Sequence, residues 1–290
     1  MLIKRLSIIG VGLIGGSLAR ALRRAGVCGE IVGCGRNIAN LEKAVELGVI
    51  DSYETVPADA VNKADMVIVA VPLGSMAAMF AAIRDALSPD AVISDVGSAK
   101  ASVVEDARQY LGEHFRSFVP AHPIAGTEKS GVIASFAELF DKRRVIITPL
   151  SDTDSAAFAK VSRMWEKTGA VVENMSVEHH DSVLAATSHL PHLLAYSLVD
   201  TLAKMETSTE IFRFAAGGFR DFTRIASSNP RMWRDICLAN QKAILEMLAH
   251  FNYDLADLTD AVSSGDANRI ENIFSRAKVA RDNFCEDKVV

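Results

Sequence analysis

Residues 8–19 read Ile-Ile-Gly-Val-Gly-Leu-Ile-Gly-Gly-Ser-Leu-Ala, and this stretch decides the fold of the N-terminal part of the chain. An apolar run from Leu6 to Ile9 leads into it, and a helical pattern follows it, with Leu18 and Leu22 on one face. Strand, glycine turn and helix in this order are the context in which Gly-x-Gly-x-x-Gly indicates a dinucleotide-binding site.

Each glycine of this motif has a physical role in that interpretation. Gly10 makes the turn, Gly12 lets the backbone approach the pyrophosphate, and Gly15 lets the helix pack close to the strand. The N-terminus of the helix offers free N–H groups and a positive dipole end to the phosphates. We therefore expect Gly10, Gly12, Leu13, Ile14 and Gly15 to bind the cofactor. A glycine-rich turn in another α/β protein is the alternative.

Length, charge and cysteine content narrow the class of protein. The 290 residues are enough for two domains, and the net charge of −5 argues against a nucleic-acid binder. No apolar run approaches the roughly 20 residues that span a bilayer, and the N-terminus passes straight into the first strand without room for a signal peptide. The four cysteines lack metal-ligand spacing, so we expect reduced thiols in a cytoplasmic protein.

Strand-like segments alternate with helical patterns over the first 174 residues. They lie at 4–9, 30–34, 65–71, 91–95, 117–121, 144–148 and 171–174. Several are continuous apolar runs, as expected of parallel strands that are covered on both faces. This pattern predicts an α/β fold, with a doubly wound Rossmann-type parallel sheet in a dinucleotide-binding domain of residues 1–174.

The pattern changes at about residue 176, after which we find no convincing strand. Helical periodicity covers residues 177–205, 230–262 and 266–284, which predicts an all-helical C-terminal domain of residues 175–290. The second of these helices carries a wide apolar stripe. Such a stripe suggests a homodimer that is formed through the C-terminal helices, with a plain helical core as the alternative.

The end of the second strand bears on the choice of cofactor. It reads Cys34-Gly35-Arg36-Asn37, without an acidic residue. In NAD-binding folds an acid about 20 positions after the glycine loop bonds the adenine ribose. Arg36 can instead pair with a 2′-phosphate, so the sequence favours NADP over NAD. An arginine that only lies over the adenine ring is the alternative.

Three further candidates follow strands at the same edge of the sheet, where ligands bind in open α/β folds. Val71 and Pro72 follow the strand at 65–71, and Ser98 follows the strand at 91–95. Ser98 can cap the next helix or point at the nicotinamide. His122 ends the strand after that, where it is well placed as a general base that titrates near neutrality.

The helical half contributes a pair of histidines and a pair of arginines. His189 and His192 lie three positions apart and share a helix face. Zinc binding by this pair is disfavoured because no thiol or third histidine has suitable spacing, so we expect no metal. Arg220 and Arg224 can face an anionic ligand or lie on a solvated helix face. We assign no role to His180.

Together these segments resemble the prephenate/arogenate dehydrogenase family, also called cyclohexadienyl dehydrogenases, over nearly the whole chain. The resemblance is carried by Gly-Val-Gly-Leu-Ile-Gly-Gly-Ser at 10–17, Asp-Val-Gly-Ser-Ala-Lys at 95–100, His-Pro-Ile-Ala-Gly-Thr-Glu-Lys-Ser-Gly at 122–131, Ser-His-Leu-Pro-His at 188–192 and Gly-Gly-Phe-Arg-Asp-Phe-Thr-Arg-Ile-Ala at 217–226. The first motif is common among nucleotide-binding proteins, whereas the last three, in this order, are specific.

The resemblance implies NAD(P)-dependent oxidative decarboxylation of prephenate, arogenate or both, to 4-hydroxyphenylpyruvate or tyrosine, in tyrosine biosynthesis. By this resemblance His122 is the base that bonds the 4-hydroxyl group, and Ser98 orients it. Arg224 corresponds to the arginine that binds a substrate carboxylate. His189 and His192 correspond to the pair that lines the substrate pocket, with His192 as the direct contact.

The resemblance also matches Thr127 and Glu128 to a loop that closes over the small-molecule substrate. An acid facing the substrate side chain would favour arogenate, and Glu128 or Asp221 can take that place.

Two alternative functions remain. A 3-hydroxyacid-type Rossmann dehydrogenase would use a catalytic lysine, and the His122 loop does not fit it. A non-catalytic NADP(H) sensor would have lost the base or Arg224, which are both present.

Overall fold

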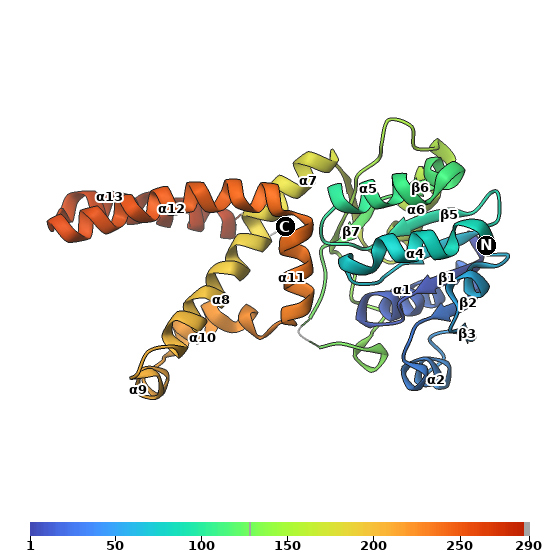
Figure 1. The fold of residues 1–290 in the computed structure, drawn as a ribbon, viewed down its shortest axis with the longest axis horizontal. Helices are drawn as coiled ribbons and strands as arrows, with labels where there is room; N and C mark the ends of the chain where they lie inside the picture. Colours follow the sequence, from blue (N-terminus) through green and yellow to red (C-terminus); the bar gives the residue numbers. More distant parts are fainter. Residues whose placement is uncertain (128, 287–290) are drawn as a thin grey trace. The chain divides into compact units, whose positions relative to one another are not determined.

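The computed structural model describes residues 1–127 and 129–286, and the chain forms two compact units, residues 1–241 and 242–290 (Figure 1). The first unit contains all the strands of the described residues. The last strand, β9 (Val171–Asn174), ends where the predicted N-terminal domain ends, and the described elements after it are helical. The domain boundary at 174/175 remains a prediction, since the two compact units divide elsewhere.

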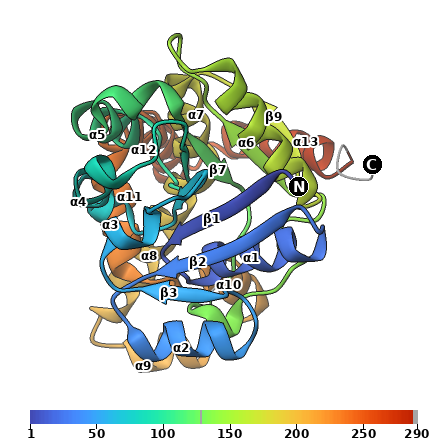
Figure 2. The same ribbon diagram turned by 90° about the vertical axis from the view of Figure 1, so that its right-hand side faces the viewer.

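A six-stranded parallel sheet forms the centre of the first unit, with strand order β3-β2-β1-β4-β5-β6 (Figure 2). Its strands are β1 (Ile3–Ile9), β2 (Cys28–Cys34), β3 (Ser52–Glu54), β4 (Met66–Val69), β5 (Val92–Asp95) and β6 (Phe118–Val119). The order reverses between β1 and β4, and ligands bind at such a switch point beside the carboxyl ends of the strands. The predicted Rossmann-type fold is confirmed.

Helices cover both faces of this sheet. They are α1 (Leu13–Arg24), α2 (Ile38–Glu46), α3 (Pro57–Val61), α4 (Met76–Ile83), α5 (Ala101–Tyr110) and α6 (Ser155–Lys167). Successive strand residues point to opposite faces, so Ile8 joins the core cluster with α1 and α6 while Ile9 joins the cluster with α4 and α5. Burial on both faces explains why these strands are continuous apolar runs.

The segment predicted as one strand at 117–121 is two strands in two sheets. Pro120 separates β6 from β7 (Ala121–Pro123). Because proline has no N–H to donate to a ladder, the first sheet ends there. β7 pairs antiparallel with β8 (Arg144–Ile147), which pairs parallel with β9. His122 therefore lies within the small second sheet, opposite Ile146, rather than in a loop after a parallel strand.

The helices that follow β9 in the first unit are α7 (Val177–Leu184), α8 (Leu190–Ala203), α9 (Ser208–Arg213), α10 (Gly217–Thr223) and α11 (Pro230–Ala239). The predicted helix at 177–205 contains a π-helical turn, Ala185–His189, just before Pro191. Pro191 cannot donate to the carbonyl one turn back, which favours such a local change. The predicted helix at 230–262 is interrupted at Asn240, whose backbone leaves the helical region.

The second unit consists of two long helices, α12 (Gln241–Ser264), which starts at the end of the first unit, and α13 (Ala267–Glu286). Gly265 has a φ of 66°, in the left-handed region that glycine adopts without strain, and it ends α12. Of the helices in the described part of the chain, none has the length and apolar content needed to cross a membrane.

Candidate active site

A cavity of about 880 Å³ opens at the carboxyl ends of β1, β2 and β4. Five of the residues predicted to bind the cofactor line it, namely Gly10, Gly12, Arg36, Val71 and Pro72. The structure thus brings the glycine turn, the end of β2 and the end of β4 to one place. This is the switch point where a dinucleotide binds in folds of this kind.

The glycine turn leaves room where a phosphate would lie. A Cβ on Gly12 would meet no atom within 4 Å, and no side chain caps α1 at this position. A Cβ on Gly10, which has a φ of 103°, would lie 2.2 Å from the Ala70 carbonyl oxygen. A Cβ on Gly15 would lie 2.3 Å from the carbonyl oxygen of Gly10. Gly10 and Gly15 therefore have to be glycine, and the uncapped helix end at Gly12 fits a pyrophosphate.

Leu13 and Ile14 take a different place from the glycines. Their side chains are partly buried and pack against the apolar core, and neither residue lines the cavity. They begin α1, so only their backbone N–H groups are oriented for a phosphate at the helix end. The contact predicted for these two positions is therefore one that any residue with a backbone N–H can make.

Arg36 belongs to the lining of this cavity. Arg36 is exposed, and among the described residues that line the cavity none is Asp or Glu. Asn40 also lies here, where it bonds the Val11 carbonyl through Nδ2 and accepts the Val132 N–H at Oδ1. The side chain of Asn40 thus ties the glycine turn to the segment that follows His122.

A chain of hydrogen bonds runs from β7 into α7. His122 is only 8% exposed, and its Nδ1 lies 2.9 Å from Nε2 of His180. The other ring nitrogen of His180, Nδ1, lies 2.8 Å from Oδ1 of Asp181. The candidate base is therefore joined to a buried carboxylate through a second histidine, which the sequence analysis had left without a role.

The carboxylate of Asp181 also caps α5. It accepts the N–H of Lys100 at 2.8 Å and the N–H of Ala101 at 2.9 Å. No side chain at the start of α5 makes this cap, so the interpretation of Ser98 as the capping residue is wrong. Ser98 is half-buried, and its backbone is bonded by His189 instead.

A buried ion pair lies beside this chain. Lys100 and Asp95 are both inaccessible to solvent, and their side chains are paired. The Nζ of Lys100 also donates to the Ala121 carbonyl at 2.7 Å, while Oδ1 of Asp95 accepts the Ala121 N–H at 3.1 Å. The pair thereby attaches the end of β5 to the strand that carries His122.

The two histidines of the helical half both contact one tryptophan, Trp233. The ring of His192 stacks on Trp233 with centroids 3.6 Å apart, and the ring of His189 meets it edge-on at 6.1 Å. The Nδ2 of Asn240 donates to the Asp181 carbonyl at 2.8 Å and lies 3.1 Å from Nδ1 of His189. The indole N–H of Trp233 is buried and has no hydrogen-bond partner among the described residues.

Burial keeps all four histidines of this region neutral. It lowers the pKa of His122 well below its usual value, and neighbouring His180 and Lys100 act in the same direction. It also lowers the pKa of His180, and it lowers that of His189 to about 4. The pKa of His192 falls through burial and the charge of Arg224. We therefore expect His122 to titrate at a more acidic pH than the near-neutral value predicted from the sequence.

The remaining predicted substrate contacts lie at the edge of this region. Arg224 is exposed at the start of the turn after α10, and its charge acts on His192. Thr127 is exposed and accepts the N–H of Lys129 at 3.2 Å. Glu128 lies outside the described residues. Among the residues that are described, no group of His, Cys, Asp and Glu is arranged to hold a metal ion.

The sequence analysis missed six residues of this site, which are Asp95, Lys100, His180, Asp181, Trp233 and Asn240. A signal existed for three of them. Asp95 and Lys100 are the first and last residues of the motif at 95–100, and Asn240 lies inside a predicted helix where asparagine is unfavourable. The adjacency of His180 and Asp181 carries no signal of its own.

Comparison with known proteins places this site in a family. The prephenate dehydrogenase nucleotide-binding domain matches residues 18–174, and the prephenate dehydrogenase dimerization domain matches residues 176–276. The chain belongs to the prephenate dehydrogenase family. The predicted family and the predicted enzyme class, an NAD(P)-dependent dehydrogenase of tyrosine biosynthesis, are thereby confirmed.

The chain matches individual members of this family over most of their length. A cyclohexadienyl dehydrogenase of Zymomonas mobilis is 42% identical, over 96% of this chain and 95% of the relative. A prephenate dehydrogenase of Bacillus subtilis is 38% identical, over 96% and 75%. The crystal structure of prephenate dehydrogenase from A. aeolicus with hydroxyphenyl propionate and NAD+ superposes with a TM-score of 0.91, at 39% identity, over 97% and 98% of the chains.

The geometry of the glycine turn gives a matched pair of variants. Gly15→Ala forces a Cβ against backbone and should lower the free energy of unfolding by about 1–3 kcal/mol, measured by denaturant titration. Gly12→Ala places its Cβ in open space, so it should change stability by less than about 0.5 kcal/mol yet weaken dinucleotide binding at least tenfold. Equal stability losses, or unchanged affinity in Gly12→Ala, would contradict this assignment.

Proposed function

We propose that the protein oxidatively decarboxylates prephenate, arogenate or both, with His122 as the general base. A nicotinamide bound in the cavity supplies the hydride acceptor of such a reaction. The observation that carries the proposal is a buried, neutral histidine whose strand is attached to the carboxyl end of β5 by the Asp95–Lys100 pair. A neutral imidazole can take the proton of the 4-hydroxyl group at physiological pH.

The substrate is held, in this proposal, by residues of the helical segments. Arg224 supplies the positive charge for a carboxylate, and its effect on the pKa of His192 supports their proximity. In this proposal His192, stacked on Trp233, presents a rigid ring to the substrate, and His189 meets the same indole edge-on. The backbone bond between His189 and Ser98 supports a role for Ser98 at the junction of cofactor and substrate.

The loop after His122 completes the proposed site. Thr127 is exposed and forms a local bond to the N–H of Lys129, so its hydroxyl lies in a polar segment that can meet a ligand. We include Glu128 as the other member of the closing loop, on the family resemblance alone. Asp221, which is exposed in α10, is the second acid that would favour the amino group of arogenate.

We further propose that NADP is preferred over NAD. An exposed guanidinium at a cavity rim without described acidic residues suits a 2′-phosphate, for which arginine has the matching geometry. The A. aeolicus enzyme was crystallised with NAD+, so the two cofactors have to be compared directly. We also propose a reducing, cytoplasmic location, because the four cysteines are free thiols.

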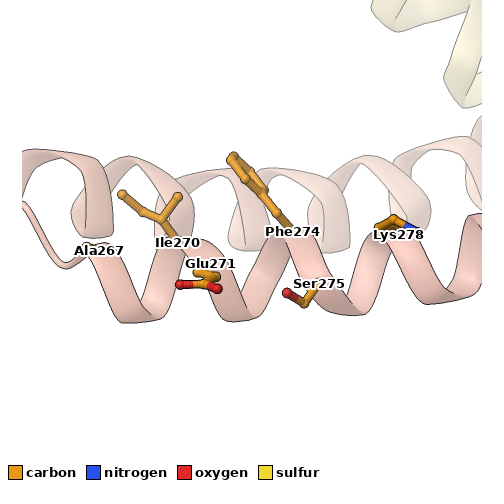
Figure 3. Close-up of a pocket in the computed structure, with 6 residues that line it drawn as sticks. All are labelled: Ala267, Ile270, Glu271, Phe274, Ser275 and Lys278. Carbon is orange, nitrogen blue, oxygen red and sulfur yellow. The ribbon is translucent and has the colours of Figure 1, made fainter.

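Finally, we propose that residues 1–174 bind the dinucleotide and that residues 175–290 bind substrate and form a homodimer. The apolar side chains of the second unit support the dimer, since Leu245, Val262, Phe274 and Val279 are all more than half exposed in the single chain. On α13, Ala267, Ile270 and Phe274 line a hollow of about 540 Å³ with three polar residues (Figure 3). Exposed apolar surface of this kind marks an interface.

The proposed roles of His122 and Arg224 predict different kinetic effects. His122→Asn should lower kcat by about 10²–10⁴ because it removes the proton acceptor. It should also abolish the acidic limb of the kcat profile, which in the wild type falls as pH drops below the depressed pKa of His122. Arg224→Ala should mainly raise KM, because it binds the substrate before reaction as well. Prephenate and arogenate are assayed with each protein.

Two results of this assay would contradict the proposal. If folded wild-type protein oxidises neither substrate, the activity is wrong. If His122→Asn changes only KM and keeps the acidic limb, the base lies elsewhere, and His189 is the next histidine of the site to test.

The role of Arg36 predicts the cofactor preference. The kcat/KM should be higher with NADP than with NAD. Arg36→Ala should reduce the kcat/KM for NADP about tenfold or more and leave the kcat/KM for NAD nearly unchanged, because the lost contact is to the 2′-phosphate alone. Lys43→Ala, which removes another exposed cation of the same region, is the matched control and should change neither value. A wild type that prefers NAD tenfold would refute this assignment.

The exposed face of α13 predicts the oligomeric state. Phe274→Asp should raise the dimer dissociation constant about 100-fold or more, since a symmetric interface loses two buried rings. Sedimentation equilibrium measures this change. Val56 is similarly exposed but lies in the first unit, so Val56→Asp should leave the dimer dissociation constant unchanged. A dimer that is unaffected by Phe274→Asp would place the interface elsewhere.

A further inference from the structure

We propose that His180 and Asp181 are positioning residues that fix the tautomer of His122, with its proton on Nδ1 and a free electron pair on Nε2. The proposal rests on the function proposed above, in which His122 is the base. It assigns a part in the reaction to two residues of α7. Neither of them lines the dinucleotide cavity, and the ring of His180 is not part of the stack on Trp233. The argument follows the hydrogen bonds from the carboxylate outward.

The carboxylate of Asp181 can only be an acceptor toward its neighbours. Two of its partners are the backbone N–H groups of Lys100 and Ala101, which can only donate. Although burial alone would raise the pKa of Asp181, these two donors and His180 lower it below its usual value. The group is therefore ionised at neutral pH, and its Oδ1 accepts a proton from Nδ1 of His180 at 2.8 Å.

The state of His180 then follows from its burial. Its ring is inaccessible to solvent, and burial lowers its pKa, so it is neutral and carries one proton. Because that proton lies on Nδ1 toward Asp181, Nε2 of His180 has only an electron pair to offer. The 2.9 Å contact between Nε2 of His180 and Nδ1 of His122 therefore requires that His122 donates.

The same reasoning gives the free nitrogen of His122. A neutral imidazole that donates from Nδ1 has no proton on Nε2, so Nε2 is left as the proton acceptor. When the 4-hydroxyl group gives up its proton, the O–H bond breaks, its electron pair remains on oxygen, and a new N–H bond forms at Nε2. The positive charge that results on His122 is stabilised through His180 by the Asp181 carboxylate.

The charged and titratable groups around His122 come from four elements. They are His180 and Asp181 of α7, His189 of the π-helical turn, Lys100 before α5 and Asp95 of β5. Lys100 disfavours a second positive charge on His122, and its own charge is balanced by Asp95. Of the two carboxylates in this set, Asp95 is paired with Lys100, so Asp181 is the one that stabilises a protonated His122.

A purely structural role for Asp181 predicts a different result. As the cap of α5, it would affect stability when replaced, while the proton on His122 would stay where it is. A test must therefore observe the tautomer itself. Long-range proton–nitrogen NMR of the full-length protein labelled with ¹⁵N-histidine does so, and His122→Asn identifies the signals of His122 by their absence.

The wild type should show His122 protonated at Nδ1 and unprotonated at Nε2. In Asp181→Asn an NH₂ group at the Oδ1 position donates to Nδ1 of His180 and no longer accepts the Lys100 N–H, while the amide oxygen at the Oδ2 position still accepts the Ala101 N–H. This reverses the chain, places a proton on Nε2 of His122 and should lower kcat by about 10²–10⁴ with little change in KM. The acidic limb of the kcat profile should weaken with it.

Two variants of His180 control for folding. The side-chain oxygen of His180→Gln can accept from Nδ1 of His122, so this variant should keep the tautomer and more of kcat. His180→Leu offers no acceptor and should lose both. A wild type protonated at Nε2, or an Asp181→Asn variant with unchanged tautomer and kcat, would overturn the proposal. If the tautomer is as stated but His122→Asn keeps its kcat, the base assignment fails and the tautomer assignment stands.

Discussion

The Asp181 carboxylate is the interaction on which the rest of the site depends, because donors from two helices meet on it. The backbone N–H groups of Lys100 and Ala101 start α5, and the ring of His180 belongs to α7. One buried negative charge therefore caps one helix from another and sets the position of the histidine that contacts His122. Three donors satisfy its oxygens, which is the condition under which a buried carboxylate is tolerated.

A second buried pair carries this arrangement over to the sheets. Lys100 contributes its backbone to Asp181 and its side chain to Asp95, so a single residue joins both charges. Through Ala121 the same pair holds β7 against the end of β5. The first sheet ends at Pro120, and without this attachment the strand that bears His122 would have only β8 as a partner. The position of the candidate base relative to the cofactor cavity thus follows from polar contacts in the interior, not from the ladder of the large sheet.

The cofactor half could be predicted from the sequence, because its determinants are local. The glycine turn and the apolar strands are each specified within a few residues, and the structure places Gly10 and Gly12 on the cavity as expected. The substrate side could be predicted only as far as the family motifs reach. The break of the long helix at Asn240 was missed because its cause is tertiary, a bond to the carbonyl of Asp181. The short elements β3 and α3 were missed because three to five residues carry too little periodicity.

The charge balance explains why this site combines a dry interior with proton chemistry. Histidines that are buried without compensation lose their protons, and the low pKa values of His122 and His189 show that burial has this effect here. A base must be neutral before the reaction, yet its protonated form must not be so costly that proton transfer fails. The side chain of Lys100 is paired with Asp95, whereas the side-chain ion pair of Asp181 among the described residues is with His180. A proton that arrives on His122 is therefore stabilised by the negative charge of Asp181 through His180, and it does not add an isolated charge to the core.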